Sequence, residues 1–330
     1  MPVVSYQNKQ YTLKEGEILL DALVEQGVSL SYACRQGACH TCLLQCLTGT
    51  IPEASQKGLK QTQREQNYFL ACQCIPEADI SVAEIDADKL FVESQVITKE
   101  MLSPSVCRLV LQRPPGYDYR AGQFLNLRKD EHLIRSYSFA SVATLDEDIE
   151  LHIKRIENGR VSGWIHDDLQ PGDRVLIEEA SGDCFYTREN EDKPMLLVGT
   201  GTGLAPLKGI VRDAIQQGHK ESIILYHGVR TVDELYQHEV LKELATMHSN
   251  VLYNGCVSGE AQGLPADMLA GRAADIAFAE HNNLKGWRVY LCGSPPMVMR
   301  FKKLAFINGA LMTDIFTDAF EMAAPVTPAA

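Results

Sequence analysis

Six of the ten cysteines in this 330-residue chain lie in its first quarter. Three of them, Cys34, Cys39 and Cys42, follow the spacing C-x4-C-x2-C, which is typical of thiolates that bind a [2Fe–2S] cluster. Gly37 and Ala38 lie between these cysteines. Such small residues let the backbone curl and bring its amides close to the cluster sulfides. This loop is therefore predicted to hold three ligands of a two-iron centre.

A fourth thiolate must come from outside this loop. Cys72, Cys74 and Cys46 are the nearby cysteines. A zinc site is the main alternative, because zinc also binds clustered thiolates. Zinc sites usually pair two short Cys-x2–4-Cys motifs, and here such pairing would leave Cys34 unused. The spacing therefore favours the iron–sulfur centre over zinc.

A second chemical motif is the glycine-rich segment at residues 199–203. The apolar run 194–198 precedes it and predicts a buried parallel strand, and a helix is expected to follow to about Gln217. A glycine-rich turn between a strand and a helix can cradle a pyrophosphate. Pro206 suits the first turn of that helix. Further strands are expected at 223–226, 251–253 and 289–291 and a helix near 238–247, which predicts a doubly wound parallel sheet.

The segment between these motifs is rich in short strands. Turn signals occur at residues 114–116, 121–124, 158–159 and 171–173, and strands at this spacing indicate an antiparallel barrel. Strand alternation would place Arg135 and Tyr137 on one face and Ser136 and Ser138 on the other. A glycine turn at Gly159 opens a predicted short helix, where backbone amides and a serine hydroxyl can bind an anion.

Composition limits the remaining possibilities. The chain has 43 acidic and 31 basic residues and a net charge of −12, which argues against a nucleic-acid-binding protein. The sequence contains no run of eighteen apolar residues, so no membrane helix is predicted. Residues 1–10 lack the apolar core of a secretion signal. A cytoplasmic monomer that binds neither membrane nor nucleic acid is expected. Cys107, Cys184, Cys256 and Cys292 are scattered singly, as is typical of small buried side chains.

The first 86 residues resemble a β-grasp ferredoxin. Strands are expected at 3–6, 10–13 and 80–85, and a helix at 17–26. The resemblance implies that Cys72 is the fourth cluster ligand and that Cys74 and Cys46 are not ligands. The expected fold is thus multi-domain α+β and α/β. It comprises a ferredoxin domain (1–86), an antiparallel β-barrel flavin domain (91–190), a doubly wound nucleotide domain (191–320) and a flexible tail (321–330).

Residues 135–138 have the pattern R-x-Y-S, which resembles the signature of ferredoxin–NADP reductase-type flavin domains. The resemblance implies that Arg135 pairs with a flavin phosphate, that Tyr137 stacks on the ring and that Ser138 reaches the N5 edge. It adds a set of supporting flavin-site residues: Ser136, His152, Lys154, Gly159, Val161, Ser162 and Phe320. The segment 179–185 departs from the family pattern, because its first glycine and its proline are missing.

The nucleotide domain carries a second family motif. Residues 292–297 match the pattern Cys-Gly-x-Pro-x-Met. The resemblance implies that Cys292 lies beside the nicotinamide carbon that gives up hydride, although a buried thiol at a strand end is the alternative. The nucleotide-binding residues expected in this way are Gly199, Thr200, Gly201, Thr202, Gly203, Pro206, Arg230, Cys292, Gly293, Pro295 and Met297.

Taken together, the three modules resemble the reductase components of bacterial multicomponent oxygenases, such as the benzoate dioxygenase and soluble methane monooxygenase reductases. The resemblance implies FAD and electron flow from NADH through FAD to the cluster and on to an oxygenase. NADH is favoured over NADPH because Gly259 stands where NADPH-specific relatives have arginine, although Arg230 could still bind a phosphate. A partner in sugar deoxygenation or dehydration is an alternative, as is a non-enzymatic electron carrier.

Overall fold

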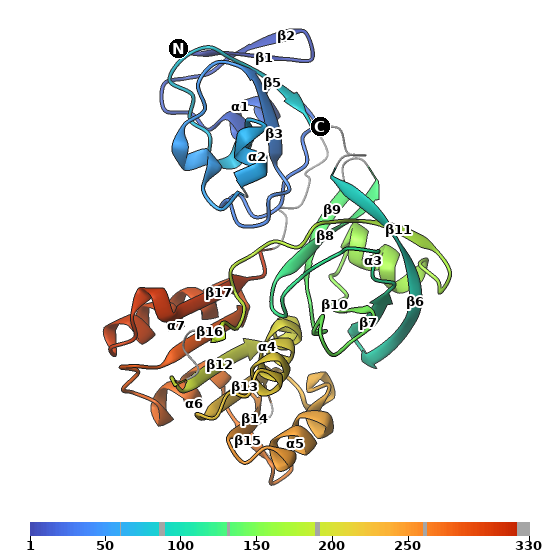
Figure 1. Cartoon of the computed structure of the whole chain (residues 1–330), viewed down its shortest axis with the longest axis vertical. Coiled ribbons are helices and arrows are strands. Elements are labelled where there is room, and N and C mark those ends of the chain that lie inside the picture. Colours follow the sequence, from blue (N-terminus) through green and yellow to red (C-terminus); the bar gives the residue numbers. More distant parts are fainter. Residues whose placement is uncertain (60, 86–89, 131–132, 189–191, 260–262, 322–330) are drawn as a thin grey trace.

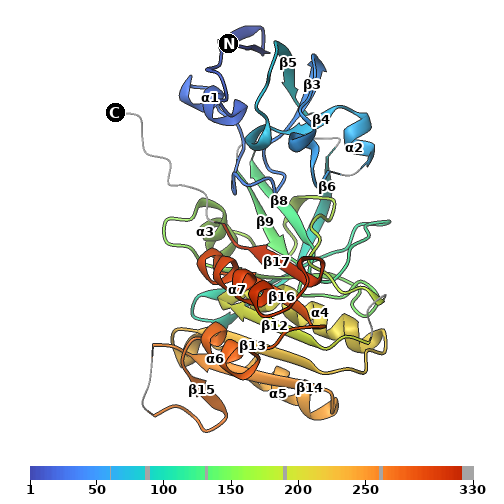
Figure 2. The same ribbon diagram turned by 90° about the vertical axis from the view of Figure 1, so that its left-hand side faces the viewer.

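The computed structural model describes residues 1–59, 61–85, 90–130, 133–188, 192–259 and 263–321. Three sheets divide this part of the chain into three bodies: the N-terminal body at the top of Figure 1, a barrel below it on the right and a layered α/β body below it on the left. The same order is visible in the rotated view of Figure 2. No helix in the described ranges has the length and apolar character needed to cross a membrane.

The N-terminal body is a five-stranded sheet with the order β2-β1-β5-β3-β4, in which β1 and β5 are parallel. Its elements are β1 (Val3–Tyr6), β2 (Lys9–Thr12), α1 (Leu19–Glu25), β3 (Leu43–Thr48), α2 (Gln61–Glu65), β4 (Tyr68–Leu70) and β5 (Ile80–Glu84), with 3₁₀ turns at Glu53–Gln56 and Ala71–Gln73. The helix begins two residues later than expected, because Ile18 is still extended. The backbone amide of Leu19 donates to the carbonyl of Cys74 at 2.8 Å, so α1 is fixed against the second cysteine segment.

The second body is a closed antiparallel barrel. Its strands are β6 (Phe91–Ser103), β7 (Val106–Leu111), β8 (Phe124–Asp130), β9 (Leu133–Ser138), β10 (Ile149–Lys154) and β11 (Arg174–Glu178), in the order β10-β7-β6-β11-β8-β9. A bridge between Phe139 and Leu151 joins the two ends of the sheet. The helix α3 (Arg160–Asp167) buries Val161 and Ile165 in the barrel core. The predicted barrel is therefore confirmed.

The third body is a parallel six-stranded sheet with helices on both faces. Its strands are β12 (Met195–Thr200), β13 (Ile223–Val229), β14 (Val251–Val257), β15 (Met268–Ala270), β16 (Arg288–Gly293) and β17 (Ile315–Ala319), in the order β15-β14-β13-β12-β16-β17. Its helices are α4 (Leu204–Gln216), α5 (His238–Met247), α6 (Ala273–Glu280) and α7 (Pro295–Ile307), with 3₁₀ turns at Gly201–Gly203, Val232–Glu234 and Met312–Asp314.

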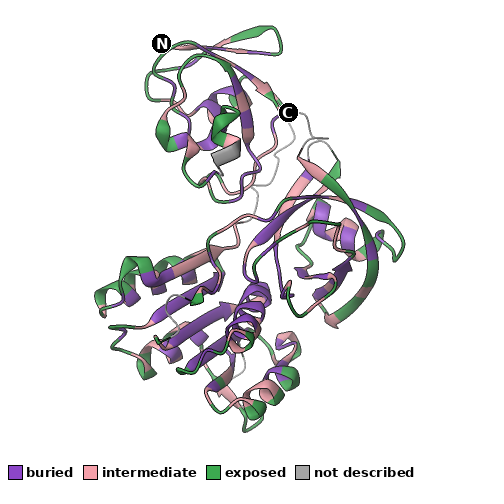
Figure 3. Ribbon diagram, in the orientation of Figure 1, coloured by how far each residue is buried: buried purple, intermediate pink, exposed green. Residues whose placement is uncertain are grey.

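Alternating side chains of β12 separate two hydrophobic cores. Met195 and Leu197 pack in the core beneath α4 and α5, whereas Leu196 and Val198 pack in the core beneath α6 and α7. The central strands are consequently buried on both faces, as Figure 3 shows. A doubly wound sheet requires this pattern, so the predicted fold is confirmed.

Ion pairs fasten helix α4 to the barrel. Lys208 lies 2.9 Å from Glu150 of β10, and Arg212 makes two hydrogen bonds of 2.7 and 2.8 Å to Asp146. A Cβ atom on Gly209 would meet barrel carbonyls at 3.2 and 3.4 Å, so this face of α4 lies directly on the barrel. The carboxyl ends of the parallel strands are thereby held toward the flavin strand β9.

The N-terminal body meets the barrel beside its cysteine loop. Ile85 and Leu90 both pack against the N-terminal core, and β6 of the barrel begins at the next residue, Phe91. The predicted polar join at 86–90 lies outside the described residues except for Leu90, and the predicted tail lies outside them except for Glu321. The domain limits therefore stay a prediction.

Candidate functional site

The cysteine loop between α1 and β3 brings three thiols to the 3₁₀ turn that carries Cys72. The backbone amides of Gln36 and Cys39 donate to Sγ of Cys34 at 3.4 Å each. A thiol hydrogen bond from Cys39 lowers the pKa of Cys34 to about 5, and one from Cys42 lowers the pKa of Cys72 to about 7. These contacts form two pairs, and the electrostatic interactions of Cys39 with Cys42 and of Cys34 with Cys72 show that the pairs are neighbours.

The backbone of this loop is shaped for close approach to an inorganic group. Arg35, Gly37 and His40 adopt left-handed conformations with φ of 55°, 78° and 56°, so the chain coils tightly around the thiols. Amide hydrogens aimed at sulfur stabilise thiolates, and four thiolates are the donor set of a [2Fe–2S] cluster. The residues present therefore fit the cluster.

The two spare cysteines lie elsewhere. Cys74 is fully buried in the hydrophobic core, and burial raises the pKa of its thiol to about 12. Cys46 points from β3 into the same core and donates to the carbonyl of Thr48 at 3.3 Å. Their surroundings favour neutral thiols, which are poor metal ligands.

One cavity of about 1510 Å³ joins the three bodies. Its walls come from the cysteine loop, from β9 of the barrel and from the carboxyl ends of β12, β13 and β16. The predicted site residues that line it are Cys34, Cys39, Arg135, Ser136, Tyr137, Ser138, His152, Lys154, Gly159, Val161, Ser162, Thr200, Gly201, Thr202, Arg230, Gly293, Pro295, Met297 and Phe320. The remaining predicted residues Cys42, Cys72, Gly199, Gly203, Pro206 and Cys292 are buried around it.

Arg135 supplies the positive charge of the barrel wall. Its guanidinium donates to the carbonyl of Ile134 at 2.7 Å and forms no ion pair within the described ranges. Burial lowers its pKa, and the nearby positive charge of Arg160 adds to this effect. A half-buried cation without a carboxylate suits a phosphate group. The amides at the start of α3 and the Ser162 hydroxyl lie at the same cavity and provide further donors.

The remaining residues of this strand have separate roles. Burial raises the pKa of Tyr137, so its phenol stays neutral and can pack against an aromatic ring. The Ser138 hydroxyl donates to Asp318 of β17 at 2.6 Å. Burial raises the pKa of Asp318 to about 6. All four residues 135–138 border the cavity, so residues from both faces of this strand contribute to its wall.

His152 borders the cavity, but its ring is engaged by protein groups. Nε2 lies 2.8 Å from Glu150 and Nδ1 lies 3.2 Å from the hydroxyl of Tyr236. The ring is 4% exposed. His152 therefore links the barrel to the nucleotide body, and its nitrogens already have partners.

The two turns of the nucleotide body touch each other. A Cβ atom on Gly203 would lie 2.2 Å from the carbonyl oxygen of Cys292, and one on Gly293 would lie 2.5 Å from that of Thr200. Nε2 of His227 lies 3.0 Å from the carbonyl of Gly201, and burial lowers the pKa of His227 to about 4, so the neutral ring donates this hydrogen bond. Only glycine fits at these contacts, so the two turns can approach each other this closely.

The thiol of Cys292 does not border the cavity in this structure. It is fully buried at the end of β16, and its Sγ lies 3.7 Å from Sγ of Cys184. Burial and this thiol contact raise the pKa of Cys292 well above its usual range. Cys292 can therefore support a bound ring by packing, as a neutral thiol.

Two residues that the sequence did not single out, Asn126 and Glu178, join the flavin strand to the cysteine loop. Asp318, in the C-terminal strand that resembles the acid-bearing strand of the family, joins the flavin strand to the nucleotide sheet. The sequence signal for Asn126 is a polar residue inside the apolar strand segment Phe-Leu-Asn-Leu. No comparable local signal marks the contact of Cys184 with Cys292.

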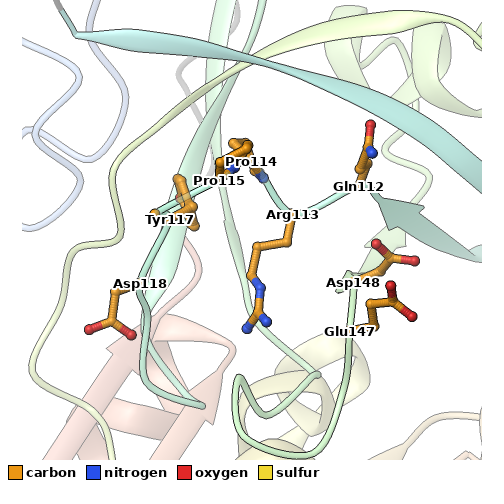
Figure 4. Close-up of a pocket in the computed structure, with 9 residues that line it drawn as sticks. Gln112, Arg113, Pro114, Pro115, Tyr117, Asp118, Glu147 and Asp148 are labelled. Carbon is orange, nitrogen blue, oxygen red and sulfur yellow. The ribbon is translucent and has the colours of Figure 1, made fainter.

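A smaller pocket of about 520 Å³ lies on the barrel around Arg113. Figure 4 shows Arg113 between the segment of Pro114, Pro115 and Asp118 and the one that carries Glu147 and Asp148. The residues that line it include none of the predicted site residues. The larger cavity is thus the candidate functional site.

Comparisons with known proteins agree with this division. Residues 4–77 match the family described as 2Fe-2S iron-sulfur cluster binding domain, residues 93–186 the oxidoreductase FAD-binding domain and residues 197–303 the oxidoreductase NAD-binding domain. These modules around one cavity define an NAD(P)H-dependent flavin iron–sulfur oxidoreductase that uses a [2Fe–2S] cluster and FAD.

Full-length relatives narrow this class. The chain is 31% identical over 324 residues to the ferredoxin–NAD(P)+ reductase component of the naphthalene 1,2-dioxygenase/salicylate 5-hydroxylase systems of Ralstonia sp., covering 96% of this chain and 98% of the relative. It is 33% identical to the reductase subunit of an aromatic O-demethylase of Amycolatopsis sp., covering 89% and 91%. The crystal structure of an Amycolatopsis cytochrome P450 reductase superposes with a TM-score of 0.69 at 30% identity, covering 97% and 99%. The chain belongs to the family of reductase components of multicomponent oxygenases.

Proposed function

We propose that this chain takes electrons from NADH and delivers them singly to a separate oxygenase component. The main observation that supports this function is that the cysteine loop, the R-x-Y-S strand and the glycine turns line one cavity. When bound, the flavin accepts two electrons from a nicotinamide and the cluster passes them on one at a time.

The protein residues bind and orient these groups. Arg135, the start of α3 and Ser162 would hold the flavin phosphates, and Tyr137 would pack against the ring. The hydrogen bond from Ser138 to Asp318 would fix the polar edge of the ring site. Cys34, Cys39, Cys42 and Cys72 would hold the cluster, and the glycine turns, with Pro206 in the first turn of α4, would hold the nucleotide pyrophosphate above the buried Cys292.

The preference for NADH is supported by the backbone at Gly259. Its amide donates to the carbonyl of Arg230 at 2.7 Å, and a Cβ atom there would lie 2.6 Å from that oxygen. An arginine for the extra phosphate of NADPH cannot stand at this position without moving Arg230. The next residue in the sequence, Glu260, has an acidic side chain that would repel such a phosphate, and it lies outside the described residues.

An anaerobic absorption titration tests the electron path. Flavin and iron–sulfur bands should bleach in stages as NADH is added, with about three electrons accepted per chain. NADPH should bleach them much more slowly. Iron–sulfur absorption without flavin, or bands that only dithionite reduces, would contradict a reductase.

Partner and assembly need their own measurements. We infer an oxygenase partner from the family, and addition of a purified oxidised oxygenase component should accelerate NADH oxidation. We propose a cytoplasmic location, and the chain is proposed to act as a monomer of 36.6 kDa. Light scattering after gel filtration would show a larger mass if it were an oligomer.

A further inference from the structure

Asn126 is a buried polar residue in an apolar part of strand β8. It is 3% exposed, and its neighbours Leu125 and Leu127 are fully buried. Burying an amide side chain is unfavourable unless hydrogen bonds replace those lost to water. The position therefore requires partners supplied by the fold.

The structure gives Asn126 a complete set of partners. Its Nδ2 donates to the carbonyl oxygen of Cys39 at 3.0 Å and to a carboxylate oxygen of Glu178 at 2.7 Å. Its Oδ1 accepts from the Ser136 hydroxyl at 2.7 Å. The carbonyl of Cys39 and the carboxylate of Glu178 can only accept hydrogen bonds. The amide nitrogen of Asn126 must therefore face both of them. The orientation of the side chain is thus fixed by chemistry.

These bonds connect three segments that are distant in sequence. Cys39 is a predicted cluster ligand, Ser136 belongs to the flavin strand and Glu178 ends β11 of the barrel. Cys34 and Cys39 line the same cavity as Tyr137 and Ser138. Asn126 therefore holds the inner end of the cysteine loop directly against the flavin strand.

A hydrogen bond from this loop to the C-terminal body is different in kind. The side chain of Gln36 donates to Glu321 at 3.0 Å, and this bond is exposed. Water competes for exposed hydrogen bonds, whereas removal of one partner of a buried bond leaves the other polar group without a replacement for its lost hydration. The buried hydrogen bonds of Asn126 therefore hold the cysteine loop more strongly than the exposed bond of Gln36 does.

We propose that Asn126 is a positioning residue for electron transfer from the flavin to the cluster. It fixes the separation of the flavin site and the cluster site. Its N–H also stabilises additional electron density on the Cys39 peptide, and this raises the reduction potential of the cluster. In the step it serves, the reduced flavin loses one electron and the oxidised cluster gains one, and no bond is broken. This inference rests on the proposed function.

The variant Asn126→Asp removes both donors with little change in shape. It also places a second carboxylate beside Glu178, so barrel stability could change for an unrelated reason. The double variant Asn126→Asp with Glu178→Gln separates the two effects. There the amide introduced in place of the Glu178 carboxylate can donate to the new carboxylate, which restores the link inside the barrel, while the bond to Cys39 stays absent. Ser94→Ala, which removes a buried barrel hydrogen bond of 2.7 Å to the carbonyl of Gln112 and does not involve the cysteine loop, is the matched control.

The first readout is the single-turnover reaction followed by stopped-flow absorption. In the double variant, reduction of the flavin by NADH should stay within about twofold of wild type, while transfer to the cluster slows by about tenfold or more. The control should match wild type in both steps. Equal cluster-reduction rates in the double variant and wild type would overturn the proposal.

Two further readouts do not depend on turnover. Spectroelectrochemical titration should show a lower cluster potential in the double variant, and hydrogen exchange should show weaker protection of residues 34–42. A potential and an exchange pattern equal to wild type would also overturn the proposal. If wild type itself is not reduced by NADH, the proposed function fails instead, so the two failures are distinguishable.

Discussion

Replacement of Gly203 by alanine tests how closely the two turns of the nucleotide site must meet. A Cβ atom there would lie 2.2 Å from the carbonyl oxygen of Cys292 and 2.9 Å from Cα of Gly293. Unstrained contacts need about 3.5 Å, so one turn must move by roughly 1 Å. Gly203 itself has φ of −58° and ψ of −13°, which alanine adopts freely. The effect is therefore steric.

The size of the loss follows from this displacement. A shift of ~1 Å in groups that orient a reacting molecule can lower the rate by about 100-fold. The same crowding should destabilise the nucleotide body by about 1–3 kcal/mol. None of the three atoms nearest to a Cβ on Gly203 belongs to the cysteine loop. The visible absorption of the cluster should therefore be unchanged in this variant.

Gly163→Ala is the matched control. Gly163 lies inside α3, and a Cβ atom there would have no neighbour within 4 Å. Alanine should stabilise that helix by about 0.5–1 kcal/mol and leave the reaction with NADH unchanged. Stopped-flow reduction of the flavin over a range of NADH concentrations measures both variants. If Gly203→Ala reacts within about threefold of Gly163→Ala, the steric reasoning is wrong.

Three other outcomes are expected. Cys72→Ser should abolish the cluster absorption and its electron paramagnetic resonance signal, whereas Cys74→Ser should keep both; loss in both variants would contradict the proposed ligand set. Arg135→Leu should raise the dissociation constant for FAD by at least about tenfold, by about 1.4 kcal/mol or more, in ultrafiltration assays; unchanged retention would refute its role. The pKa of Asp318 is raised to about 6 in the folded chain, whereas an unfolded aspartate has a pKa of about 3.9. The contribution of this group to folding stability is therefore fully present below a pH of about 3.9 and is lost as the pH rises through 6. Asp318→Asn should therefore gain melting temperature over wild type near pH 8 but not near pH 4, and a constant difference would exclude this titration.

The fold was accessible from the sequence because its signals are local. The apolar run before Gly199, the turn residues of the barrel and the strand–helix alternation each act within about twenty residues. Small errors arose where a tertiary contact decided the boundary. The helix α1 begins at Leu19 because the chain before it is extended and the first helical amide binds the carbonyl of Cys74.

The candidate site was less accessible because its contacts are distant in sequence. Asn126 and Cys39 are 87 positions apart, and Cys184 and Cys292 are 108 positions apart. A single sequence carries no signal for such pairings beyond the polarity of one strand residue. The strand pattern of β9 likewise did not show that residues from both of its faces border one cavity.

The attachment of the N-terminal body to the barrel has a kinetic consequence. Leu90 packs on the core of one body and Phe91 begins the first strand of the next, so neighbouring residues of the chain belong to the two bodies. A ferredoxin domain that left the flavin strand would stay tethered to the barrel and could not diffuse away. Its local concentration would stay on the order of millimolar. An external acceptor would therefore compete with the flavin strand for a tethered cluster, and the tether and the affinity of docking would set the balance between return and delivery.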